Sequence, residues 1–279
     1  MEKEKIKTME LISTKLIIIS VFLLIVTTIE TLAYSTRLSG ARVGLIASAL
    51  SLFNTMIIVS RFSTMFQQPM TGKLIGEAPE VNTLDFLQDQ YRILLGVTTL
   101  GVCLGIFLFP TFIAIFSRAI TQLSLEKGSI FTVIKKWSNK QGLQKVIACI
   151  RLPRLSYLKG INKRTFPKRM FVANVLITSI YTVGVLSALY ASVIVEPKYA
   201  AAAITSSGII NGVATILLTL FVDPKASVLA DQVVKKQNKY VYLKSYSFAM
   251  VSSKLVGTLL AQAIFIPAAL YIAWFAHWI

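Results

Sequence analysis

Six long apolar runs limit what this chain can fold into. They lie near residues 15–36, 43–66, 91–116, 171–195, 200–222 and 248–275. Each run supplies about the ~20 mostly apolar residues that a helix needs to cross ~30 Å of hydrocarbon. Lipid offers no partner to an unpaired backbone group, so we expect all six runs to be helical. The sequence therefore predicts an all-α polytopic membrane protein with six transmembrane helices.

The composition agrees with a membrane protein, because 55% of the residues are hydrophobic, 15% are charged and the mean hydropathy is +0.68. The first run extends from Leu16 to Tyr34, which is longer than the h-region of a signal peptide, and no A-x-A site follows it. We expect this run to span the membrane. If it did not, a five-span protein with an inside N-terminus would result.

The positive charges predict the orientation of the helices. With the N-terminus outside, twenty Lys and Arg residues fall on the inner side and seven on the outer side, as positive-inside bias requires. The lysines of the N-terminal tail oppose this choice and are partly offset by neighbouring acids. This topology also explains the net charge of +17 without a nucleic-acid partner. The expected location is a membrane that the chain crosses several times.

A basic segment, 117–170, separates the first three runs from the last three and contains thirteen Lys or Arg residues and one acid, Glu126. We expect it to be a cytoplasmic connector that attracts anionic phospholipid headgroups, at ~1 kcal/mol per basic residue. Apolar residues recur in it at helical spacing opposite Lys145 and Arg151. This pattern fits a helix in the membrane interface or one packed on other cytoplasmic parts; the apolar residues are Leu143, Val146, Ile147 and Ile150.

The two halves of the chain match each other at an offset of 155 to 157 residues. Three spans in each half mean that the second half enters the membrane from the opposite side, so equivalent loops should carry opposite charge. The loop after Pro69 is acidic and the loop after Pro224 is basic, as expected. We predict a 3+3 inverted repeat, a common plan of secondary transporters, with one half in 1–116, the connector in 117–170 and the other half in 171–279. The matched pairs are Tyr34 with Tyr190, Asn54 with Asn211, Pro69 with Pro224, and Pro110 with Pro267. We expect the helices to kink at Pro110 and Pro267.

Three charged residues lie well inside the apolar runs, away from their ends: Glu30, Arg61 and Lys254. A charge at a helix centre costs ~2.5–3.5 kcal/mol on insertion scales, so such residues are functional candidates. Counting residues from the ends of the runs puts Glu30 and Lys254 at the same level near the inner side and predicts an ion pair. The same count puts Arg61 in the outer third, too high to reach Glu30. Arg61 could also snorkel to the outer headgroups.

The equivalent residues Asn54 and Asn211 each lie about eleven residues into their runs, close to the expected midplane. We expect them to face each other across the pseudo-axis, where they could donate hydrogen bonds to a substrate. The alternative of equal weight is that each asparagine only bonds a neighbouring helix.

The sequence lacks the motifs of membrane enzymes and pumps. It has no HExxH, no paired DxxD and no GxxxxGK[ST] loop, which excludes an ATP-driven machine within this chain. His277 is the only histidine, and Cys103 and Cys149 form no CxxC, so neither a metal site nor a disulfide framework is expected. We predict no catalytic residue and no cofactor. The spacing of Gly101 and Gly105 is typical of helix packing.

The runs ETLAYSTRLSGAR and SLFNTMIIVSRFSTMFQQPMTGKL, together with six spans, resemble the alternative lipid II flippase family of bacteria, the Amj type. The resemblance covers the chain and is most distinctive over residues 29–74. It implies transport of lipid II, the undecaprenyl-pyrophosphate-linked peptidoglycan precursor, from the inner to the outer leaflet of the bacterial cytoplasmic membrane. Two alternatives are a non-transporting assembly or regulatory protein that docks partners through 117–170, and a transporter of another anionic lipid. The sequence leaves open whether the chain forms a homo-oligomer.

A diphosphate cargo that starts on the inner leaflet needs cations at the inner entrance and a polar route across. The residues that we expect to supply them therefore follow the path of the headgroup. They are Arg37, Arg42 and Lys254 at the entrance, Glu30 beside Lys254 as a competing anion or proton carrier, Asn54 and Asn211 midway, and Arg61 and Lys73 at the outer end.

Overall fold

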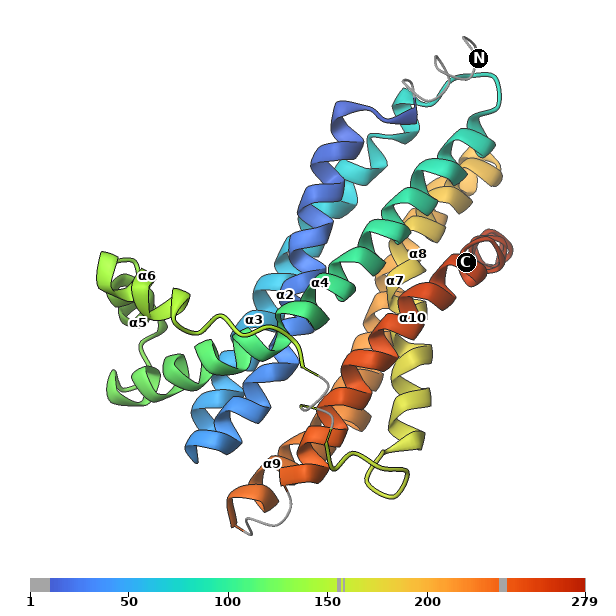
Figure 1. Cartoon of the computed structure of the whole chain (residues 1–279). Coiled ribbons are helices and arrows are strands. Elements are labelled where there is room, and N and C mark those ends of the chain that lie inside the picture. The colour runs from blue at the N-terminus through green and yellow to red at the C-terminus, as the bar shows by residue number, and fades with distance from the viewer. Residues whose placement is uncertain (1–10, 155–156, 158, 236–239, 279) are drawn as a thin grey trace.

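The computed structural model describes residues 11–154, 157, 159–235 and 240–278, and within these residues it is built from helices without a β-strand. Six helices are long and apolar enough to cross a membrane, as the sequence predicts. They run up and down in one bundle (Figure 1). In chain order their main parts are α2 (Thr14–Val43), α3 (Ile46–Gly72), α4 (Thr83–Leu125), α7 (Lys168–Ile194), α8 (Pro197–Leu217) and α10 (Tyr240–Phe275).

Several helices are longer than the apolar runs that predict them. α2 continues to Val43, through the polar stretch where a loop was expected, and ends at Gly44, whose φ of 73° suits a left-handed C-cap. α10 likewise begins at Tyr240 instead of residue 248. Hydropathy marks only the lipid-facing part of a helix, because polar residues that pack against other helices also continue it. These extensions change the relative levels of the charged side chains.

The helices form two groups of three. In one group α2 packs against both α3 and α4, and in the other α7 packs against both α8 and α10. Small residues allow the close approaches: a Cβ on Gly101 of α4 would lie 2.9 Å from the carbonyl oxygen of Leu24, and one on Gly257 of α10 would lie 2.9 Å from that of Val175. Gly101 therefore serves packing, as its spacing predicts.

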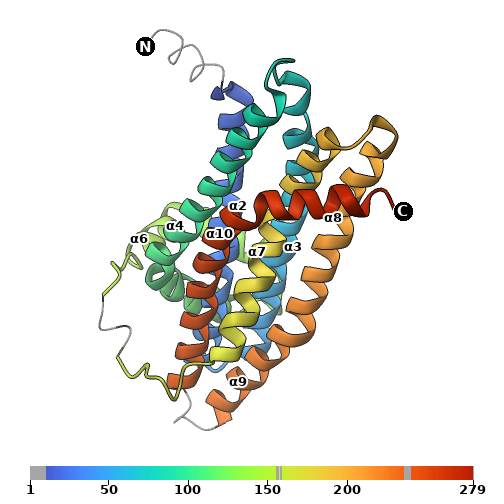
Figure 2. The same ribbon diagram turned by 90° about the vertical axis from the view of Figure 1, so that its right-hand side faces the viewer.

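α4 and α10 contact each other where the two groups meet, and each contains a proline, Pro110 and Pro267. Both helices change direction along their length, α4 in Figure 1 and α10 in Figure 2. Beyond the prolines, Phe116 and Ile120 of α4 pack against α2 and α3, and Ile272 of α10 packs beside residues of α7 and α8. α4 and α10 thus contact each other where the groups meet. Beyond its proline, each helix packs on its own group, α4 on α2 and α3 and α10 on α7 and α8.

Shorter elements lie near the ends of the bundle. α5 (Ile130–Trp137) and α6 (Lys140–Ile147) follow α4, and the chain then crosses from α4 towards the start of α7 (Figure 1). α8 continues through one π-helical turn, η3 (Leu218–Val222), into α9 (Asp223–Lys235), and a 3-10 turn, η1 (Ile75–Glu77), follows α3. The π-turn precedes Pro224, whose missing N–H interrupts the α-helical ladder.

The two ends of the bundle differ in charge. We call the end with the α3–α4 loop the acidic end, because Glu77, Glu80 and Asp85 lie there. The other end, which holds the α2–α3 turn, the end of α9, the start of α10 and the described part of the 117–170 segment, is the basic end. At the end of α4 the Nζ of Lys136 donates to Glu126, which lowers the pKa of this carboxyl below its usual range.

Candidate functional site

A cavity of about 120 Å³ lies between the two helix groups and is lined by residues of α2, α3, α4, α7, α8, η3 and α10. It contains the three charged residues well inside the apolar runs, Glu30, Arg61 and Lys254. We call it the central cavity. Two cations and one carboxylate line it, so its formal charge is positive and suits an anionic group.

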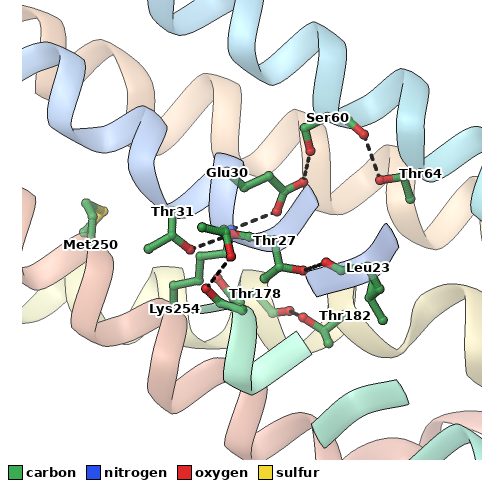
Figure 3. A network of polar contacts seen from close by, with 12 residues as sticks. Leu23, Thr27, Glu30, Thr31, Ser60, Thr64, Thr178, Thr182, Met250 and Lys254 are labelled. Atoms are coloured by element: carbon green, nitrogen blue, oxygen red, sulfur yellow. Dashed lines mark hydrogen bonds and ion pairs between the residues drawn. The ribbon is translucent and has the colours of Figure 1, made fainter. Parts of the chain in front are cut away.

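The predicted ion pair of Glu30 and Lys254 is present in the central cavity. The Nζ of Lys254 lies 2.8 Å from Oε2 of Glu30, and the two side chains are only 10% and 18% exposed. The hydroxyl of Ser60 on α3 donates to the other carboxylate oxygen of Glu30 (Figure 3). One carboxylate therefore links α2 to α3 within its own group and to α10 of the other group.

Arg61 also joins the two helix groups. Its Nη1 donates to Oγ1 of Thr215 on α8, at 2.6 Å. Seven residues further along α3, Gln68 donates to Ser207 of α8 at 2.8 Å. As the residue number rises on α3 it falls on α8, so these two helices run antiparallel where they meet.

The remaining polar lining of the central cavity is neutral. Asn211 contributes a buried Oδ1 that has no hydrogen-bond partner, and this atom lies 2.4 Å from where a Cβ on Gly184 would stand. Tyr181 interacts with Thr64 across the groups. A buried acceptor without a partner is unfavourable unless a ligand, water or another state of the protein satisfies it. The cavity can thus offer a diphosphate two cations and a set of hydroxyl and amide groups.

The predicted level of Arg61 is wrong. Its neighbour Ser60 bonds Glu30, so Arg61 lies at the level of the ion pair rather than in an outer third, and it interacts electrostatically with Glu30. Glu30 and Lys254 in turn lie near the middle of α2 and α10 instead of near one end. The error arose because the hydropathy of these runs ends before the helices do.

The predicted pairing of Asn54 with Asn211 is also wrong. Asn54 is exposed and does not line the central cavity, whereas Asn211 does. Because α3 and α8 run antiparallel and cross near Arg61 and Thr215, Asn54 lies toward the basic end and Asn211 toward the acidic end. Equivalent residues in antiparallel helices meet only at the crossing point.

The other predicted cations lie away from this cavity. Arg37 is 3% exposed, its Nη2 lies 2.7 Å from Oδ1 of Asp223, and its guanidinium packs over the ring of Phe53. It is therefore a buried, paired cation and not a free one at an entrance. Arg42 is exposed near the basic end and its Nε donates to the hydroxyl of Tyr240 at 2.8 Å. Lys73 is exposed at the C-terminal end of α3.

Sequence reasoning missed four partners: Ser60, Thr215, Tyr181 and Asp223. Three of them are ordinary polar residues of membrane helices, and nothing in their spacing distinguishes them from other such residues. Asp223 stood next to the predicted end of an apolar run, in the pair Asp223-Pro224, and could have been found as the only acid near that end. Among the described residues no group of three metal-ligating side chains occurs.

Comparison with known proteins identifies the family. The model of the Amj family, described as "Alternate to MurJ", matches residues 22–276. The chain is 55% identical over 270 residues to the protein named lipid II flippase Amj of Bacillus subtilis (strain 168), covering 97% of this chain and 100% of that protein. No solved structure matches. The family match spans most of the chain, and the relative matches over its whole length, so the chain belongs to the Amj family.

Proposed function

We propose that this chain moves lipid II from the inner to the outer leaflet of the bacterial cytoplasmic membrane for cell-wall synthesis. The observation that carries the proposal is the central cavity, where Glu30, Arg61 and Lys254 from both helix groups meet at mid-helix. Family membership and the relative named lipid II flippase supply the cargo. The chain is a multi-pass membrane protein and acts as a transporter, not as an enzyme.

The two helix groups act as the halves of an inverted repeat, residues 1–116 and 171–279, joined by the connector 117–170. Matching contacts support this assignment. α2 and α7 each pack against the other two helices of their group, and α4 contacts α7 as α10 contacts α2. Phe116 beyond the bend of α4 corresponds to Ile272 beyond the bend of α10.

The basic end faces the cytoplasm in this proposal, as positive-inside bias favours. The connector and the nearby lysines then lie against the inner leaflet, where they attract anionic phospholipid headgroups. The apolar residues Val146, Ile147 and Ile150 suit an interfacial position, because Ile147 and Ile150 are exposed. Part of this predicted amphipathic pattern, the side chain of Leu143, lies outside the described residues.

The observed structure fits a closed state of an alternating-access cycle. A volume of about 120 Å³ is below the ~300–1,000 Å³ of typical ligand pockets, so the halves must separate before a headgroup enters. Two sets of contacts hold them together. Toward the acidic end Gln68 bonds Ser207, and Arg92 exchanges hydrogen bonds with Gln262.

Toward the basic end Arg37 pairs with Asp223, and Arg42 bonds Tyr240. When the basic-end contacts break and the acidic-end contacts persist, the cavity opens to the inner leaflet. When the acidic-end contacts break and the basic-end contacts persist, it opens to the outer leaflet. The diphosphate then competes with Glu30 for Lys254 and Arg61. Glu30 recovers Lys254 when the cargo leaves, or takes up a proton if transport is coupled to one.

Complementation tests the proposal in a strain that depends on this chain as its lipid II flippase. Glu30→Gln and Arg61→Ala should abolish growth while the protein still reaches the membrane in normal amounts. Glu77→Gln is the matched control, because it removes an acid of the acidic end that is exposed and outside the cavity. Normal growth from both Glu30→Gln and Arg61→Ala would contradict the assignment of the central cavity.

Cysteine labelling tests the topology separately. In a variant without Cys103 and Cys149, single cysteines replace Asp85 at the acidic end and Lys235 at the basic end. A membrane-impermeant maleimide added to whole cells should label the first position and not the second. Labelling of both positions from outside, or of Lys235→Cys alone, would contradict the inverted arrangement with the basic end in the cytoplasm.

A further inference from the structure

A second and larger cavity, of about 570 Å³, lies at the basic end between α2, α4, α10 and the segment that follows α6. We call it the basic-end cavity. It shares no lining residue with the central cavity, and its size lies within the ~300–1,000 Å³ of ligand pockets. The ion pair of Glu30 with Lys254 and the bond of Arg61 to Thr215 do not reach it, and among the closed-state contacts named above only the bond of Arg42 to Tyr240 lies in its wall.

Three cations line the basic-end cavity: Arg42, Arg154 and Lys244. None of the described residues that line it is acidic. Arg42 lies close enough to Lys244 to repel it, and the hydrogen bonds of the two side chains go to neutral acceptors, Tyr240 and the carbonyl oxygen of Lys159. Like charges held together without a counter-ion favour the binding of an anion of more than one charge.

A buried polar atom independently points to a ligand in the same place. Ser247 lines the basic-end cavity, is 1% exposed, and its Oγ has no hydrogen-bond partner. Buried hydroxyls in proteins are almost always paired, because an unpaired one loses its bonds to water. A phosphate oxygen in the cavity would accept this hydrogen bond.

Most of the remaining lining is apolar, with Tyr157, Tyr240 and Ser252 as the polar exceptions. Ile106 and Phe109 of α4 face Phe248, Val251 and Leu255 of α10 in this lining. On either side of the described lining residues of this segment, Thr111 exchanges hydrogen bonds with the backbone of Arg151, and Ser245 donates to Thr165. The cavity thus combines a cationic head with an apolar tail region.

We propose that the basic-end cavity is a loading site for a polyprenyl diphosphate lipid, separate from the central cavity. The diphosphate binds Arg42, Arg154, Lys244 and Ser247, and the first isoprene units lie between α4 and α10. Three cations suit a diphosphate better than the single charge of a phospholipid. The inference rests on the proposed transport of lipid II and adds the place where its diphosphate and lipid tail are recognised before the headgroup reaches Glu30 and Arg61.

Equilibrium binding of radiolabelled undecaprenyl diphosphate to the full-length protein in phosphatidylcholine nanodiscs tests the site. The double variant Arg42→Gln/Lys244→Gln should weaken binding about tenfold or more, because charge-assisted bonds to phosphate are lost. The matched control Lys168→Gln/Arg169→Gln removes two exposed cations of the same end that do not line the cavity and should bind normally. Equal binding by both double variants would overturn the proposal.

Labelled phosphatidylglycerol distinguishes a diphosphate site from general attraction to anionic lipid. Its binding should change less than twofold in the Arg42→Gln/Lys244→Gln variant. An equal loss for both lipids would overturn the assignment to a diphosphate. Normal loading with no transfer by the wild type would contradict the proposed function and leave the loading site standing.

Photo-crosslinking gives a second measurement that leaves the cations in place. A benzophenone amino acid at Phe248, which lines the cavity and is 39% exposed, should capture undecaprenyl diphosphate. The same amino acid at Phe62, which is 61% exposed on α3, should capture little of it. Capture at Phe62 equal to that at Phe248 would place the lipid on the general membrane surface and overturn the proposal.

Discussion

The ion pair of Glu30 and Lys254 gives the most quantitative prediction, because its two charges are largely buried and come from different helix groups. At 2.8 Å between Nζ and Oε2, the attraction is about 6 kcal/mol at an effective dielectric constant of about 20. Desolvation offsets much of this energy. Removing one partner leaves the other buried charge without its ion-pair partner and costs about 3–5 kcal/mol.

Glu30→Gln and Lys254→Met should therefore each lower the free energy of unfolding by about 3–5 kcal/mol, whereas the double variant should lie close to the wild type. The measurement is denaturant unfolding of the four proteins in detergent micelles, analysed as a double-mutant cycle. The exposed pair of Lys15 and Glu77 is the control, since its side chains are 53% and 37% exposed, and its single variants should change stability by less than about 1 kcal/mol.

The double variant also separates stability from transport. It should fold and reach the membrane but fail to support growth, because neither charge remains to handle the diphosphate. Single-variant losses below about 1 kcal/mol would mean that water screens the pair as it does a surface salt bridge. That result would refute the description of the central cavity as closed in this state.

Two further predictions follow from buried contacts outside the central cavity. Arg37→Met should lower the free energy of unfolding by about 3–5 kcal/mol, because it leaves Asp223 unpaired. The double variant Arg37→Met/Asp223→Asn should lower it by less. Equal losses for the single and double variants in unfolding experiments would show that the pair is not coupled. Gly257→Val should lower the free energy of unfolding by about 1–3 kcal/mol through overpacking, since even its Cβ would lie 2.8 Å from the Cβ of Thr178. Gly208→Val is the control and should lower it by less, because nothing lies within 4 Å of a Cβ at that position. Similar losses of stability from the two variants would contradict the close packing of α10 on α7.

The sequence predicted the helices and one contact well. Length and hydropathy identify six spans because a bilayer demands both, and the structure has six such helices. Glu30 and Lys254 were paired because charges within apolar runs are too costly to stay unpaired, and the pair is present. Both conclusions follow from the high free energy of placing a polar or charged group in hydrocarbon, which can be assigned residue by residue from the sequence.

The sequence could not predict where along the helices the contacts fall. Arg61 was placed too high relative to Glu30. The reason is that α2 continues beyond its apolar run to Val43, so Glu30 lies nearer the middle of its helix than the run suggests. Asn54 was paired with Asn211 because residue counts do not show which way neighbouring helices cross. Arg37 was expected to be free because its partner, Asp223, lies on a helix that is distant in sequence. Levels and partners depend on packing between helices, which hydropathy does not report.

The most direct test of the account is transfer of lipid II by the purified protein. Lipid II is incorporated on one side of sealed vesicles, and its access to the opposite leaflet is followed with a reagent that cannot cross the membrane. The wild type should expose lipid II faster than protein-free vesicles, while Arg61→Ala and Glu30→Gln should match the protein-free rate and Glu77→Gln the wild type. A wild-type rate equal to that of empty vesicles would contradict the proposed function, and wild-type rates from both cavity variants would contradict the route through the central cavity.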